Sequence, residues 1–160
     1  MPSTPSSSVT IKSIEAVRVI SLRAIVANYR AQSALWDRVC AFANAHGIAI
    51  AGPCLTVYFD PDYKESDVDL EVCLPIADDA VVPVDTKEFR VRTLGVIPRA
   101  ACVTHLGSYS RLPPTYTALF EWLGVHGERV NGPLREVYLA MNPDDTTEES
   151  YVTEIQAPLA

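Results

Sequence analysis

The stretch that decides the fold is residues 44–58, NAHGIAIAGPCLTVY, because it recurs eighty residues later as residues 124–138, GVHGERVNGPLREVY. The two copies share a His-Gly pair, a Gly-Pro pair and a Val-Tyr pair at the same spacing. Aligning 33–58 with 113–138 without a gap gives six identities in twenty-six positions, where chance would give roughly two. Since the identities fall on turn residues and on one strand, they indicate that one supersecondary unit is used twice.

The sharpest difference between the copies is Thr56 in the first against Glu136 in the second. A carboxylate that occurs on one side only of a duplicated strand pair marks the place where the symmetry is broken. Glu136 is therefore the leading candidate for a functional residue.

Outward from this stretch, the hydrophobic pattern of the first copy predicts a β-α-β-β unit. β-Branched residues over 14–29 predict a strand region, and apolar residues at helical spacing over 33–46 predict a helix. Strands are expected at 49–59 and 68–76, separated by a turn.

The second copy predicts the same order. A strand or hairpin is expected at 89–105, broken at Gly95, and a helix from Pro113. Strands at 134–141 and 151–157 follow, so the predicted class is α+β, with an antiparallel sheet and two helices around a central cleft.

Upstream of the helices, Val17-Arg18-Val19 aligns with Phe89-Arg90-Val91 at an offset of 72 residues. This alignment predicts that the second copy is eight residues longer before its helix. The predicted organisation is a disordered tail over residues 1–12 and one domain over 13–160. Within that domain, the first repeat spans 14–76, a linker spans 77–87, and the second repeat spans 88–159.

Length and composition favour one soluble domain, since 160 residues with 48% hydrophobic side chains bury a single core. The formal net charge is −7 and the pI is near 4.9, which argues against direct binding to a nucleic-acid backbone. A cationic or neutral small ligand suits such a field better.

The first eight residues have neither a basic segment nor an apolar core, so we expect no signal peptide, and no run approaches the roughly 18 apolar residues of a membrane span. The expected location is the cytoplasm.

No metal or cofactor site is expected, because the four cysteines lie far apart without a C-x-x-C pair: Cys40, Cys54, Cys73 and Cys102. Buried thiols are the interpretation that we favour. His46 and His126 each precede a glycine after a helix, a position where an imidazole caps the last carbonyls.

Strand alternation suggests where chemistry could lie. Tyr58 shares a strand face with Thr56, and Tyr138 shares one with Glu136. If the aliphatic face packs under the helices, this polar face looks away from them, into a cleft shared by the two repeats. Tyrosine rings beside one carboxylate suit cation recognition. The alternative is that Glu136 is a solvated residue at a strand edge.

Two further candidates have ordinary alternatives. Glu71 is equivalent to Glu154 and is expected either as further acid in the cleft or, as we favour, as a solvated strand residue. Trp122 lies on an apolar helix stripe, as Trp36 does, so core packing is the alternative to a ligand contact.

Several motifs together resemble the GyrI-like small-molecule-binding domains, which also form the effector-binding halves of AraC-type and MerR-type multidrug-responsive regulators. These motifs are His105-x-Gly107-x-Tyr109, the stretch 119–127, Gly132-Pro133-x-Arg135-Glu136-Val137-Tyr138-Leu139, Thr153-Glu154-Ile155-x-x-Pro158 and, in the first repeat, Asp67-Val68-Asp69-Leu70-Glu71-Val72-x-x-Pro75. Two features depart from the family pattern. The first repeat has Asn28-Tyr29-Arg30-Ala31 instead of H-x-G-x-Y, and we expect no helix-turn-helix ahead of the domain, because only about a dozen residues precede the first predicted strand.

The resemblance implies a twofold-repeated, SOUL-like fold whose central pocket takes amphipathic, often cationic aromatic ligands. The implied ligand-binding residues are Glu136, Tyr138, Tyr58, Tyr109, Trp122 and Glu71. The first hypothesis is a stand-alone module that sequesters or senses such ligands. The second is a hydrolase of electrophilic, cyclopropane-bearing genotoxins with Glu136 as general base, and the third is a gyrase-inhibitor-like module for a protein partner.

Overall fold

The computed structural model describes residues 8–83, 88–142 and 144–160, which form two compact units. We call Glu15–Val96 the first unit and Ile97–Ala160, together with the chain up to Ile14, the second unit. Each unit contains four antiparallel strands and one helix of 14 residues. The predicted α+β class is confirmed.

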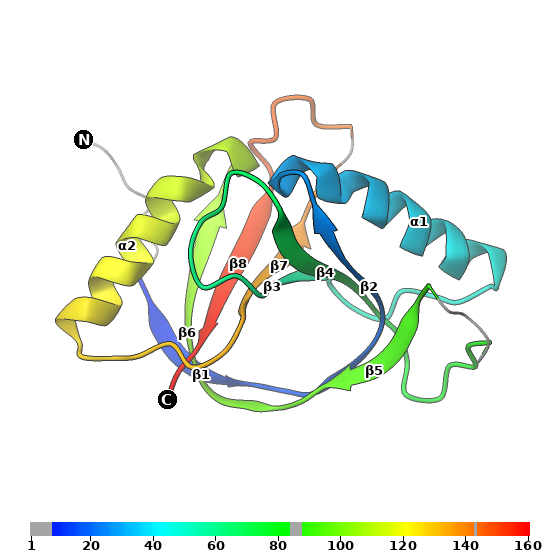
Figure 1. Ribbon diagram of the computed structural model, residues 1–160, viewed down its shortest axis with the longest axis horizontal. Coiled ribbons are helices and arrows are strands. Elements are labelled where there is room, and N and C mark those ends of the chain that lie inside the picture. The colour runs from blue at the N-terminus through cyan, green and yellow to red at the C-terminus, as the bar shows by residue number, and fades with distance from the viewer. Residues whose placement is uncertain (1–7, 84–87, 143) are drawn as a thin grey trace. The chain divides into compact units, whose positions relative to one another are not determined.

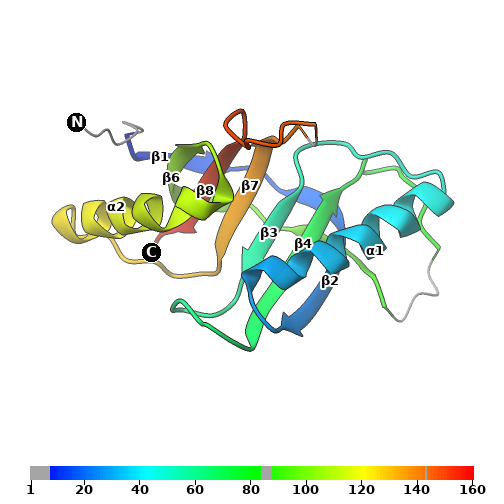
Figure 2. The same ribbon diagram turned by 90° about the horizontal axis from the view of Figure 1, so that it is seen from above.

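The first unit contains β2 (Val17–Val26), α1 (Gln32–Ala45), β3 (Leu55–Tyr58), β4 (Val68–Pro75) and β5 (Arg90–Leu94). Its strands lie in the order β5-β2-β4-β3, and α1 crosses β2 and β4 (Figures 1 and 2). Leu35 and Val39 of α1 pack on alternate residues of these strands, including Leu22, Leu70 and Val72. One face of this sheet is therefore apolar and covered by the helix.

The second unit contains β1 (Thr10–Ile14), β6 (Ile97–Leu106), α2 (Leu112–Val125), β7 (Leu134–Ala140) and β8 (Val152–Pro158). Its strand order, β1-β6-β8-β7, matches that of the first unit element for element. Leu119 and Leu123 of α2 pack on Val103 and Ile155, so the helix again covers one face.

Both helices end where the His-Gly pairs predict. Gly47 and Gly127 have φ angles of +65° and +66°, a left-handed conformation that glycine adopts without strain. Nδ1 of His126 lies 2.9 Å from the carbonyl oxygen of Trp122, which confirms the capping role for this histidine. No helix within the described residues is long and apolar enough to cross a membrane.

The leading strands differ most from the prediction. The predicted tail over residues 1–12 is wrong at its C-terminal end, because Thr10–Ile14 pairs with β6; residues 1–7 lie outside the described part of the chain. The hairpin alternative for 89–105 is wrong as well, since β5 pairs with β2 while β6 pairs with β1 and β8. Pairing between strands distant in sequence leaves no local signal, which is why periodicity missed it.

The strand register also corrects the predicted alignment upstream of the helices. Leu22 lies opposite Val72 and Val103 opposite Ile155, so β2 aligns with β6 at an offset of 81 residues rather than 72. The offset of 72 matched β2 with its own neighbour β5, because an arginine between two apolar residues fits almost any strand. The second unit is therefore not eight residues longer before its helix.

The predicted strand at 49–59 is shortened to Leu55–Tyr58. The preceding Gly52-Pro53 pair resists regular pairing, because proline has no backbone N–H to donate.

Candidate functional site

Glu136 lies on β7 and is only 7% exposed. Tyr116 of α2 donates its hydroxyl hydrogen to Oε2, and Tyr138 donates to Oε1 over 3.2 Å. Burying an ionised carboxylate is costly unless hydrogen bonds compensate, and here a phenol hydroxyl reaches each oxygen. The second unit thus holds a buried carboxylate among tyrosine side chains.

Two more tyrosine rings extend this group. Tyr109, in the short turn before α2, lies with its ring centroid 5.7 Å from that of Tyr138, edge to face, and 5.1 Å from that of Tyr151. Burial raises the pKa of the Tyr109 hydroxyl, and the neighbouring Tyr151, Glu136 and Glu148 raise it further, so the phenol stays neutral. Tyr109, Tyr116 and Tyr138 are half-buried. These three tyrosines are therefore neither fully buried nor fully exposed.

The face that carries Glu136 is the opposite of the predicted one. Glu136 lies opposite Ile155, whose side chain packs under α2, and its partner Tyr116 belongs to that helix. Likewise, Thr56 lies opposite Val72 on the side that α1 covers. The prediction was wrong because it assumed that only aliphatic strand residues face the helices. Here polar residues of each helix form hydrogen bonds with polar residues of the strands.

The first unit has a neutral amide at the equivalent location. Gln32 accepts hydrogen bonds from Thr56 (2.8 Å) and Trp36 (3.2 Å) and donates to the Tyr58 hydroxyl (3.1 Å). It also donates to the carbonyl of Tyr29 at 3.0 Å. The amide thereby uses both its donor hydrogens and its acceptor oxygen within the fold, so this group is a structural counterpart of the carboxylate group.

The sequence pattern of the GyrI-like small molecule binding domain matches residues 7–160, nearly the whole chain. The chain belongs to this family. The predicted family resemblance is confirmed, and with it the general role of a small-molecule-binding domain.

Solved structures agree with this assignment. The crystal structure of the EcmrR C-terminal domain is 24% identical with a TM-score of 0.86, and the match covers 97% of this chain and 98% of that one. In a cryo-EM structure of an EcmrR–DNA complex the identity is 25% and the TM-score 0.84, with 96% of this chain covered; the chain spans 57% of that EcmrR chain.

More distant structures share the fold alone. SAV2435 bound to tetraphenylphosphonium is 16% identical with a TM-score of 0.60, and the match covers 96% of this chain and 94% of that one. A hydrolase from Listeria innocua is 12% identical with a TM-score of 0.66, covering 98% and 94% respectively. No curated protein matches the chain.

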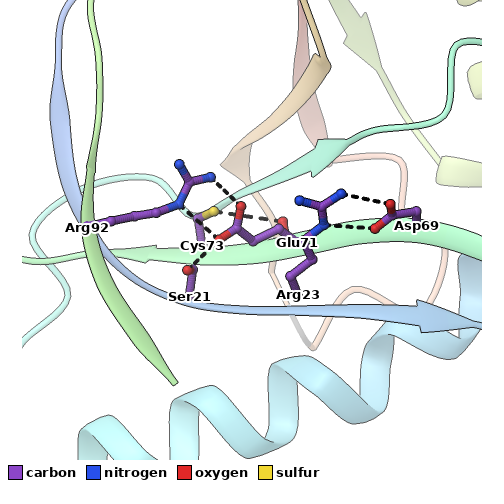
Figure 3. Close-up of polar contacts among 6 residues, drawn as sticks. All are labelled: Ser21, Arg23, Asp69, Glu71, Cys73 and Arg92. Carbon is purple, nitrogen blue, oxygen red and sulfur yellow. Dashed lines mark hydrogen bonds and ion pairs between the residues drawn. The ribbon is translucent and has the colours of Figure 1, made fainter. Parts of the chain in front are cut away.

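Glu71 of this GyrI-like domain lies away from the predicted site residues of its own unit. It is opposite Val57, whereas Tyr58 faces Leu70 on the other side of the sheet. Its side chain is fully buried, so the solvated interpretation is wrong. Figure 3 shows the carboxylate between Ser21, which donates over 2.5 Å, and Arg92, which pairs with both oxygens. This pairing makes Glu71 an internal counterion.

Trp122 lies near the C-terminal end of the GyrI-like domain's second helix. Its ring stacks on His126 with centroids 3.9 Å apart, and it packs on the apolar core of the second unit. It follows Tyr116 by six residues, which is about 9 Å along the helix axis. The packing alternative for Trp122 therefore has direct support, and its ligand contact stays a prediction, as does that of Tyr58.

Sequence reasoning missed two residues that define these groups, Tyr116 and Gln32. Tyr116 lies among apolar residues at helical spacing, so the hydrophobic pattern does not single it out. One signal could have found it: Trp36 and Tyr116 are equivalent at the offset of 80, and each aromatic ring carries a polar hydrogen, which Trp36 donates to Gln32 and Tyr116 to Glu136.

Proposed function

We propose that this domain binds amphipathic, cationic aromatic small molecules at the group formed by Glu136, Tyr109, Tyr116 and Tyr138, and thereby sequesters or senses them. The observation that carries the proposal is the buried Glu136 carboxylate with phenol rings around it. Ring faces attract a delocalised cation, and a desolvated carboxylate attracts it more strongly than a solvated one does.

Two further observations support this ligand class. The formal net charge of −7 favours the approach of cations over anions. A structure with the same fold, SAV2435, holds tetraphenylphosphonium, a cation with four phenyl rings. The EcmrR–DNA complex suggests a regulatory setting, in which ligand occupancy of such a domain is what a regulator senses.

The test is a fluorescence or calorimetric titration with tetraphenylphosphonium and with tetraphenylborate, which has the same shape and the opposite charge. We expect saturable binding of the cation alone. Glu136→Gln keeps the size of the side chain, replaces one acceptor oxygen by an amide NH2 group and removes the charge, so it should weaken binding of the cation about tenfold or more. Glu121→Gln, on the exposed side of α2, is the matched control for net charge and should change little.

Equal affinity for the two ions, or equal losses in the two variants, would contradict the proposal. Chromatography of a cationic dye after incubation tests the hydrolase alternative. Product that Glu136→Gln abolishes would replace a binding role with a catalytic one.

A further inference from the structure

A second carboxylate lies at the edge of the same tyrosine group. Glu148 belongs to the loop between β7 and β8, and its Oε1 accepts a hydrogen bond of 2.8 Å from the hydroxyl of Ser108. Ser108 directly precedes Tyr109, whose ring contacts Tyr138, and Tyr138 in turn donates to Glu136. One continuous set of contacts therefore connects the two carboxylates, with the Tyr109 ring between them.

Glu148 forms no ion pair with any of the described residues. Its side chain is half-buried, and the hydroxyl of Ser108 is a neutral donor. The buried carboxylate of the first unit, Glu71, is paired with Arg92. A partly desolvated carboxylate without a cation retains a strong attraction for one that arrives from solution.

A third feature of this group is a buried hydroxyl on the strand face that carries Tyr138. Thr153 is fully buried opposite Tyr138 in the strand register, and its hydroxyl has no hydrogen-bond partner in the described part of the chain. Buried polar groups without partners are rare in folded proteins and cost about 1–3 kcal/mol each. A hydrogen-bonding group supplied by a ligand would satisfy this hydroxyl.

The loop of the first unit contacts the equivalent tyrosine through other groups. This loop, between β3 and β4, stacks the neutral ring of Tyr63 on Tyr29, with centroids 5.3 Å apart, and the backbone N–H of Lys64 donates to the Tyr29 hydroxyl. Tyr29 is the equivalent of Tyr109. The two equivalent loops therefore supply different groups here, a tyrosine ring in the first unit and a carboxylate in the second.

We infer that the site takes dicationic aromatic ligands, with Glu136 facing one positive charge and Glu148 facing the other across the ring of Tyr109. The inference rests on the proposed function, because it adds a second charge to the ligand of that same site. Ligands of this class have a flat cationic ring system and a second ammonium group on a short chain.

Ethidium and propidium test the inference, because they share one ring system and propidium adds a quaternary ammonium group. We expect propidium to bind more tightly to the full chain. Glu148→Gln should weaken binding of propidium about tenfold and binding of ethidium less than about twofold, since only propidium has a second charge that reaches Glu148. Glutamine still accepts the hydrogen bond from Ser108, so the loop should fold as before, which a thermal melt checks.

The control is Glu149→Gln, an exposed neighbour in the same loop with the same change of net charge. Equal effects of the two variants on propidium, or equal effects of Glu148→Gln on both dyes, would overturn the second-charge inference. Binding of ethidium that depends on Glu136 would still stand in that case. Absence of binding by either dye would overturn the proposed function itself, and the inference with it.

Discussion

At three equivalent positions beneath the helices, the first unit is apolar and the second is polar. The apolar set is Ala24, Leu35 and Leu70, and it belongs to one hydrophobic core. The polar set at the same places is His105, Thr115 and Thr153, all of them buried. Two halves with the same order of elements thus surround different interiors.

Hydrogen bonding explains how the second unit tolerates this interior. Nε2 of His105 lies 2.8 Å from the carbonyl oxygen of Ser108, which only accepts, so Nε2 carries the hydrogen. Nδ1 of the same ring forms a hydrogen bond of 2.8 Å with the Thr115 hydroxyl. The polar interior is bonded except at Thr153, which lies beside the tyrosines of the proposed site. At these positions the first unit therefore buries an apolar core, and the second buries a polar group.

A second contrast concerns equivalent ion pairs on the other face of each sheet. Arg92 of β5 pairs with the fully buried Glu71, whereas Lys12 of β1 pairs with Glu154 at 2.8 Å, and the side chain of Lys12 is 48% exposed. The hydrogen bonds to Glu71 raise the pKa of the Arg92 guanidinium, which keeps it charged. The same pair of strands is thus joined by a buried ion pair in one unit and by an exposed one in the other.

The largest expected effect on stability comes from removing the positively charged side chain of an ion pair. Arg92→Met leaves a carboxylate buried without a counterion and should lower the free energy of unfolding by about 3 kcal/mol. Lys12→Met should lower it by about 1 kcal/mol or less, because an exposed pair contributes little and Gln156 still donates to Glu154. Urea denaturation of the two variants measures the difference.

The double variant Arg92→Met, Glu71→Leu provides the control for this prediction. It should recover much of the loss, since an apolar pair replaces an unpaired charge. Equal destabilisation by the two single variants would show that burial does not distinguish the two ion pairs.

A smaller effect, of opposite sign in the two units, is expected at Thr153 and its equivalent Leu70. Thr153→Val removes a buried hydroxyl without a partner and keeps the shape, so stability should rise by about 1 kcal/mol. Leu70→Thr should destabilise the first unit by about 2 kcal/mol, because it adds a hydroxyl to a close-packed core. Thermal melts of both variants decide the matter, and a loss of stability in Thr153→Val would mean that its hydroxyl is bonded in solution.

The sequence predicted the features that local patterns encode. Both helices, their His-Gly ends and the strand carrying Glu136 follow from spacing and turn residues. The pairing of β1 with β6 could not be predicted, because it depends on contacts between segments about ninety residues apart.

The candidate site was predictable only in part, for a related reason. Glu136 and Tyr138 stood out because the first copy has Thr56 at the position of the carboxylate, but the helix that supplies Tyr116 was assigned to the wrong face of the strand. The burial of Glu71 was not predicted either, because its partner Arg92 lies on β5, which β2 separates from β4 in the sheet, and sequence order does not show this arrangement.

The smallest expected effect on stability concerns Asp69, which forms an ion pair with Arg23. The equivalent positions of the second unit are occupied by Thr104 and Val152, which carry no charge. Arg23 donates two hydrogen bonds, of 3.0 and 2.8 Å, to the two carboxylate oxygens, and this bonding lowers the pKa of Asp69 below its usual 3.8. A carboxyl whose pKa is lower in the folded state stabilises the fold above its unfolded pKa, and it loses that contribution as the pH falls through the lowered value.

The wild type should therefore exceed Asp69→Asn in stability by about 0.5 kcal/mol near neutral pH, and the difference should vanish in strong acid. Urea denaturation across that range measures it, with Asp62→Asn at an exposed loop position as the control. A difference that persisted in acid would mean that Asp69 acts through packing rather than through its charge, and the first unit would then depend less on ion pairs than its contacts indicate.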